Sequence, residues 1–159
     1  MENDIVIVAP HPDDEIIGCH SFLKDVTCIC FGTPMSQAEL YRLSDAFMCA
    51  TIQAKEPKVE NLPKAGLYLF PDPYFETHPL HRQWGMVGEL MMRQYGYHVL
   101  FYTVNMRAPY IFEVPHPEEK RKALDIMYPE KSDLWVYEHK YFLFEGYCEW
   151  KIGGYKWED

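Results

Sequence analysis

An uninterrupted apolar run at residues 5–9, which reads I-V-I-V-A, sets the fold class. Strands buried in a parallel sheet read in this way, because helices cover both faces of such a sheet. Pro10 and Pro12 follow at once, and proline interrupts regular strand pairing. We therefore expect a buried parallel strand whose carboxyl end opens into a rigid loop.

Strand-like and helix-like segments alternate after this first strand. Further strands are expected at residues 26–31, 66–70, 97–104 and 110–114, and helices at residues 15–23, 36–51, 78–95 and 118–127. Residues 53–64 read as a surface loop, and the aromatic-rich residues 133–157 fit no single pattern. The alternation predicts an α/β fold with a mostly parallel sheet and helices on both faces. The 159 residues fit a single domain, residues 1–159.

Composition and charge disfavour several classes of protein. The net charge of −9 is unfavourable for binding bare nucleic acid, so no such partner is expected. No run of about 18 apolar residues is present, so no transmembrane helix is expected. The acidic start of the chain differs from a secretory signal, which favours a cytoplasmic location. The five cysteines match no zinc-finger spacing, and we expect buried reduced thiols.

The loop after the first strand carries the first cluster of reactive side chains, His11-Pro-Asp-Asp-Glu15. Zinc in catalytic sites is typically held by three protein ligands, imidazoles and carboxylates among them, and by water. His11 and Asp14 can supply two of these ligands, and Asp13 then stays available to take a proton from the water. The alternative is a solvated acidic turn that binds no metal.

A second cluster, His78-Pro-Leu-His81, stands at the expected start of the 78–95 helix. Positions i and i+3 of a helix share one face, so one imidazole can bind a metal while the other reaches a substrate. An isolated pair of this kind is more often two exposed histidines at a helix end. Both clusters, however, lie in connections that follow expected strands. Ligands of open α/β sheets gather at the carboxyl ends of the strands. We therefore expect the third metal ligand in this cluster.

The two clusters together resemble a known family. The stretch Pro10-His-Pro-Asp-Asp-Glu15 after an apolar strand resembles the first signature of the LmbE/PIG-L family of zinc-dependent N-deacetylases. The stretch from His78 to Gly85, H-P-L-H-R-Q-W-G, resembles the second motif of that family, H-P-D-H-x-x-x-G. The order of the motifs agrees, and the alternating pattern of the first 105 residues is compatible with the family.

Three features depart from the family pattern. Gly18 is followed by Cys19 where the family usually has a second glycine, and Leu80 replaces the aspartate of the second motif. The chain is also shorter than typical members. The candidate ligands are all retained, so the departures concern the substrate more than the metal.

The resemblance implies a Rossmann-like three-layer sandwich that holds one zinc ion per chain. The zinc ligands that it implies are His11, Asp14 and His81. It assigns Asp13 as the general base and places His78 beside the reacting carbonyl, where a protonated imidazole stabilises negative charge on oxygen. Arg42 is the nearest match to an arginine that contacts substrate in several members.

The activity that the resemblance implies is hydrolysis of the N-acyl bond of an N-acetylglucosamine-type amino sugar or a related small amide. The family acts on such conjugates of lipids, inositol or malate and on chitin-type sugars, so the expected partner is a small molecule or sugar conjugate. Divalent metals other than zinc fit the same residues. Two alternatives stay open: a metal-dependent phosphoesterase with Mg²⁺ or Mn²⁺, and a non-catalytic binding relative.

Overall fold

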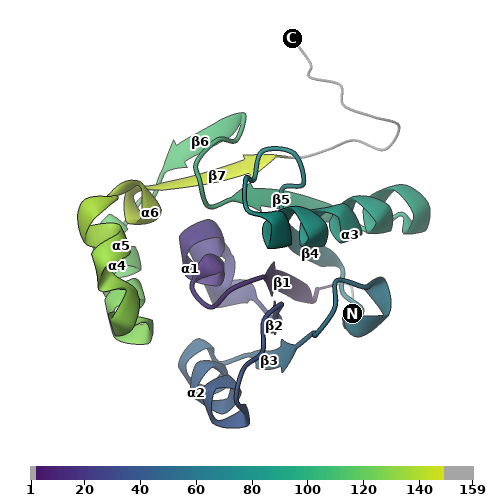
Figure 1. Ribbon diagram of the computed structural model, residues 1–159, viewed down its shortest axis with the longest axis horizontal. Coiled ribbons are helices and arrows are strands. Elements are labelled where there is room, and N and C mark those ends of the chain that lie inside the picture. The colour runs from purple at the N-terminus through teal and green to yellow at the C-terminus, as the bar shows by residue number, and fades with distance from the viewer. Residues whose placement is uncertain (1–2, 149–159) are drawn as a thin grey trace.

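The computed structural model of the protein describes residues 3–148, which form a seven-stranded sheet with helices packed against it (Figure 1). The strands are β1 (Ile5–Ala9), β2 (Cys28–Phe31), β3 (Ala50–Gln53), β4 (Leu67–Pro71), β5 (Val99–Thr103), β6 (Tyr110–Glu113) and β7 (Phe144–Cys148). Their order across the sheet is β3-β2-β1-β4-β5-β7-β6. The first five strands pair in parallel, and β7 pairs antiparallel with β5 and β6. The strand direction thus agrees with the expected mostly parallel sheet.

Helices connect the parallel strands and cover both faces of the sheet. The α-helices are α1 (Asp14–Cys19), α2 (Gln37–Phe47), α3 (Pro79–Tyr95), α4 (Pro117–Met127), α5 (Ser132–Tyr137) and α6 (Lys140–Leu143). The described residues also form three 3-10 helices: η1 (His20–Asp25), η2 (Val59–Asn61) and η3 (Pro129–Lys131). Of the aromatic-rich C-terminal segment, residues 149–157 lie outside the described residues.

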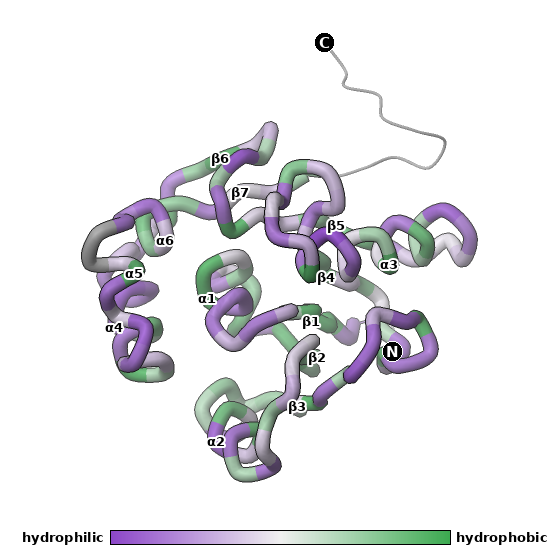
Figure 2. Tube along the Cα trace, in the orientation of Figure 1, coloured by the Kyte–Doolittle hydropathy of each residue, from purple (hydrophilic) through white to green (hydrophobic). Residues whose placement is uncertain are grey.

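The hydrophobic core has two halves, one on each face of the sheet. Val6 and Val8 of β1 pack in the half that contains α3, whereas Ile7 and Ala9 pack in the half that contains α1, α2 and α4. This alternation follows from the two-residue period of a strand. Figure 2 shows hydrophobic residues along β1 and β2 at the centre of the molecule and hydrophilic residues along α4. The expected α/β sandwich of three layers is therefore confirmed.

The segment around α2 differs from its prediction in one respect. Ser36 caps the helix at its start, because its Oγ accepts a hydrogen bond of 3.1 Å from the Glu39 amide. The helix ends at Phe47, its C-cap Met48 has a left-handed φ of 54°, and residues 50–53 then pair as β3 along β2. The prediction of a helix through residue 51 and a loop from residue 53 was wrong here, since a four-residue edge strand carries little periodic signal.

Two compositional expectations can be compared with the fold. Four of the five cysteines, Cys19, Cys28, Cys30 and Cys148, are buried thiols. None of the described helices has both the length and the apolar character needed to cross a membrane.

The strand β1 lies between β2 and β4, where the strand order changes direction. Ligands of open α/β sheets bind at such a switch point.

Candidate metal centre

The loop that leaves β1 folds tightly onto the start of α1. The His11 amide donates to Asp14 Oδ2 over 2.8 Å, and the Asp14 amide donates to the His11 carbonyl over 3.2 Å. Asp13 has a φ of 111°, which is unfavourable for a residue with a side chain. The surrounding bonds therefore hold Asp13 in place and fix His11 and Asp14 beside it, at the carboxyl end of β1.

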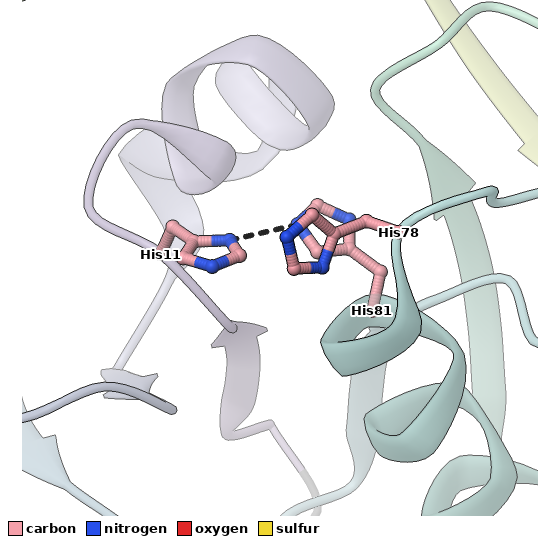
Figure 3. A group of neighbouring side chains, drawn as sticks. All are labelled: His11, His78 and His81. Carbon is pink, nitrogen blue, oxygen red and sulfur yellow. Dashed lines mark hydrogen bonds between the residues drawn. The ribbon is translucent and has the colours of Figure 1, made fainter.

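The first turn of α3 presents the two histidines of the second motif. His78 is the N-cap residue, and its Nδ1 accepts a hydrogen bond of 3.1 Å from the Leu80 amide. Pro79 takes the first helical position, where a missing N–H costs no helical bond. His81 follows one turn into the helix and is only 3% exposed. Both imidazoles point toward His11 (Figure 3).

Gly85 allows α3 to approach the end of β4 closely. A Cβ at this position would lie 2.5 Å from the Pro71 carbonyl oxygen and 2.6 Å from the Pro73 nitrogen. Both neighbours are backbone atoms, which cannot move aside as a flexible side chain can. The glycine of the second motif therefore sets the distance between β4 and the helix that carries His81.

Three side-chain atoms from the two motifs form a small triangle. His11 Nδ1 lies 3.1 Å from His81 Nε2, His81 Nε2 lies 3.0 Å from Asp14 Oδ2, and His11 Nδ1 lies 3.4 Å from Asp14 Oδ2. Zinc–ligand distances of about 2.0–2.2 Å in a tetrahedral site place two ligand atoms about 3.3 Å apart. The three atoms thus have the spacing of three ligands that share one small cation.

His78 completes a group of three histidines with His11 and His81, whose candidate ligand atoms all lie within 4.8 Å of one another. Its ring centroid lies 4.7 Å from that of His11 and 5.2 Å from that of His81. His78 is exposed, and its Nδ1 is already engaged by Leu80. The shorter distances to Asp14 favour Asp14 as the third ligand and leave His78 at the rim of the site.

Glu76 supports His81 from the side opposite the triangle. Its carboxylate is buried, with Oε2 3.4 Å from His81 Nδ1, and its Oε1 accepts a hydrogen bond from the Val104 amide. His81 Nδ1 is buried without a well-aligned hydrogen bond within the described residues. A carboxylate behind a metal-binding histidine fixes the ring and its tautomer. Glu76 lies where such a carboxylate is needed.

The charges around the triangle favour a cation at its centre. Burial alone would lower the pKa of His81, but the carboxylates of Asp14 and Glu76 outweigh burial and raise this pKa to about 10. Burial likewise opposes ionisation of Asp14, yet His81 and His11 lower the pKa of its carboxyl group below the ordinary value. A positive charge is therefore stabilised between these groups, whether it is a proton or a metal ion.

Asp13 lies beside the triangle, and other groups hold it. Its amide donates to Glu15 Oε2 over 3.0 Å, and its Oδ2 accepts a hydrogen bond of 3.1 Å from Lys131 Nζ. Burial, together with the charge of Asp14, raises the pKa of Asp13 to about 8 despite the opposing effect of Lys131. Burial also raises the pKa of Glu15 to about 7. A bound dication would lower the pKa of Asp13 again.

The environment of His78 bears on its protonation state. Partial loss of solvation and the neighbouring imidazoles of His11 and His81 lower the pKa of His78. Because Nδ1 accepts the Leu80 N–H, the proton of the neutral ring resides on Nε2, which then can donate a hydrogen bond. The geometry favours this neutral tautomer over the imidazolium ion expected from the sequence.

Arg42 is engaged on the surface of the molecule. Its guanidinium pairs with the carboxylate of Glu39 and donates a hydrogen bond of 3.0 Å to the Met127 carbonyl. These contacts join α2 to the end of α4. A contact between Arg42 and a substrate stays a prediction.

Three neighbours of the site lack a signal in the sequence: Glu76, Tyr128 and Lys131. Tyr128 is buried in the core, and its hydroxyl donates to Glu15. Glu76 and Lys131 belong to connections without a recognisable motif. Charged residues in turns are common, and only the folded chain shows which of them point inward. Trp135 is also buried in the core, and its Nε1 donates a hydrogen bond to Asp125.

Comparisons with known proteins add no assignment. No protein-family model, curated protein or solved structure matches the chain.

Proposed function

We propose that the chain is a zinc-dependent hydrolase that removes an acyl group from the nitrogen of an N-acylated amino sugar or a related small amide. The observation that carries this proposal is the triangle of His11 Nδ1, Asp14 Oδ2 and His81 Nε2, with sides of 3.0 to 3.4 Å. Three protein ligands leave a further position for water or substrate, as in catalytic zinc sites. Asp13 and His78 flank the triangle without belonging to it.

The donor set supports zinc over the cations of the alternative activity. Two imidazole nitrogens and one carboxylate oxygen suit zinc, whereas Mg²⁺ prefers oxygen ligands and retains several waters. When bound, zinc supplies a charge that lowers the pKa of a coordinated water from ~15.7 toward ~7 and polarises a carbonyl group. The remaining chemistry belongs to the side chains around the triangle.

Asp13 acts as the general base and then as the general acid. Its carboxylate accepts a proton from water as the water oxygen bonds to the carbonyl carbon of the amide. The carbon–nitrogen bond then breaks, and Asp13 returns the proton to the nitrogen of the leaving amine. The products are a carboxylic acid and a free amine. His78 donates from Nε2 to the carbonyl oxygen while negative charge develops there.

Metal content and turnover test the proposal together. Purified protein is expected to hold about one zinc per chain by elemental analysis, as a three-ligand catalytic site requires, and His81→Ala is expected to lose it. Asp13→Asn is expected to retain zinc while release of acetate from N-acetylglucosamine conjugates falls about 10²–10⁴-fold.

Other results would redirect the assignment. Wild-type protein without zinc after reconstitution, but with Mg²⁺- or Mn²⁺-dependent cleavage of a phosphoester, would favour the phosphoesterase. Zinc binding without turnover of any N-acetylated sugar or amide in a screen would favour a non-catalytic relative. An Asp13→Asn variant with wild-type turnover would remove Asp13 from the mechanism.

A further inference from the structure

Lys131 reaches the loop after β1 from the opposite end of the chain. It is the last residue of η3, and its ammonium group donates to the Pro12 carbonyl and, over 3.1 Å, to Asp13 Oδ2. The side chain is 30% exposed, so the ammonium group is placed at the edge of the site. The contact joins residues 118 positions apart in the chain.

The segment that carries Lys131 holds Asp13 through a second route. Tyr128, just before η3, donates its hydroxyl proton to Glu15 Oε1, and Glu15 Oε2 accepts the N–H of Asp13. Glu15 thus fixes the backbone of Asp13, and Lys131 fixes its carboxylate. A residue in a left-handed conformation persists only where its surroundings hold it, and residues 128–131 supply that support.

Lys131 also supplies positive charge beside a group of buried carboxyl groups. Asp13, Asp14 and Glu15 are consecutive and buried, which brings three carboxyl groups into a poorly solvated region. Within residues 3–148, Lys131 is the only lysine or arginine in an ion pair with any of the three. The histidines of the triangle face Asp14, and in the described part of the chain Lys131 is the cationic partner of Asp13.

The two oxygens of Asp13 are consequently not equivalent. Oδ2 is occupied by Lys131, while Oδ1 accepts no hydrogen bond from the described residues. We propose that Lys131 is a positioning residue for the hydrolysis: by holding Oδ2, it presents Oδ1 as the oxygen that takes the proton of the attacking water. This inference rests on the proposed function, and it gives the C-terminal third of the chain an influence on the reaction that acts through Asp13.

Lysine variants test the inference by separating kcat from KM. In zinc-loaded protein acting on an N-acetylglucosamine conjugate, Lys131→Met is expected to lower kcat about 10- to 100-fold, part of the contribution of the general base. Its KM and zinc content are expected to stay within about 2-fold of wild type. Lys131→Arg is expected to recover most of kcat, because a guanidinium group retains the positive charge and the N–H donors that face Asp13 Oδ2. Lys122→Met, at an exposed position of α4, serves as the matched control.

A double variant distinguishes positioning from an independent effect. If Lys131 acts through Asp13, adding Lys131→Met to Asp13→Asn lowers the remaining kcat less than 2-fold. If the fold-losses of kcat in the two single variants multiply in the double variant, the inference is overturned. It is also overturned if Lys131→Met keeps the wild-type kcat, or if Lys131→Arg has a kcat as low as that of Lys131→Met. If wild-type protein has no turnover, the proposed function fails and this inference with it. If the wild-type protein does turn over substrate and any of these contrary results is found, only the role of Lys131 is overturned, and the proposed function stands.

Discussion

The two ring nitrogens of His81 face different partners, and the difference explains why its surroundings matter as much as the ring itself. Nε2 completes the triangle with His11 and Asp14, while Nδ1 faces the buried carboxylate of Glu76. A ring that can rotate presents its ligand atom only part of the time. In the proposed zinc site, Glu76 thus orients a ligand without touching the metal.

Replacing Glu76 by glutamine is expected to weaken zinc binding about 10- to 100-fold, the usual effect of removing a carboxylate behind a ligating histidine. The amide retains the size of the side chain but loses the charge that orients the imidazole. Competition with a chromophoric chelator measures the affinity. Glu60→Gln, an exposed change on η2, is the control and is expected to leave it unchanged. Equal affinities in the two variants would show that Glu76 has no part in the site.

At the level of single residues, the sequence predicted the members of the triangle but not the groups that support them. His11, Asp14 and His81 belong to short motifs with fixed spacing, so chemistry could be assigned to them before the fold was known. Glu76 and Lys131 reach the site from separate connections. Their roles depend on how distant loops pack, and no local pattern encodes that.

Helix α3 is the element that links the site to the sheet. Its buried face packs on β4 and β5, and Gly85 lets it touch the backbone at the end of β4. His81 lies one turn before that contact. The position of His81 thus depends on a contact between a helix and a loop, and a change to that contact is expected to move this candidate ligand.

Gly85→Ala is expected to lower the free energy of unfolding by about 1–3 kcal/mol, the cost of overpacking a tight contact. The added methyl group meets Pro71 and Pro73 backbone atoms, so α3 must shift, and zinc affinity is expected to fall as well. Chemical denaturation and the chelator competition measure the two effects. The neighbouring exposed change Met86→Ala is expected to leave zinc affinity unaltered. A Gly85→Ala variant as stable as wild type would contradict the close packing.

The elements of the chain were predictable to different degrees, and the reason is physical. β1 and α3 have strong, regular patterns, and their predicted positions are close to those in the structure. β3 has four residues and one paired edge, so the fold imposes its conformation more than its sequence does. β7 inserts between β5 and β6, although β6 precedes it in the chain by many residues. Such an order depends on long-range pairing, which a periodic pattern does not reveal.

Across the whole molecule, Lys120 joins parts of the chain that are distant in sequence. It is fully buried on α4, and its ammonium group donates to the carbonyls of Ile17 and Phe144 over 2.6 and 3.1 Å. Helix α4 is thereby fastened to α1 and to the start of β7. Burial lowers the pKa of Lys120 from 10.5 to about 8, although Glu145 opposes this effect.

This burial predicts a specific pH dependence of stability. Between pH 8 and 10.5 the unfolded chain keeps a proton on Lys120 that the folded chain has lost, so stability rises with pH in this window. The contribution is on the order of 3 kcal/mol across the window. Urea denaturation at several pH values is expected to show this rise in wild type and in Lys122→Met, relative to Lys120→Met. Parallel curves for all three proteins would contradict the prediction.

The candidate ligands themselves connect remote parts of the chain, since His11 and His81 are 70 positions apart. An ion bound by both holds together two segments that separate when the chain unfolds. Because it binds only the folded form, it adds about 2.7 kcal/mol of stability when its free concentration is 100 times its dissociation constant. Differences of this size change how quickly proteins are degraded in cells. The supply of metal would then govern how long each copy of the protein survives, as well as how fast it works.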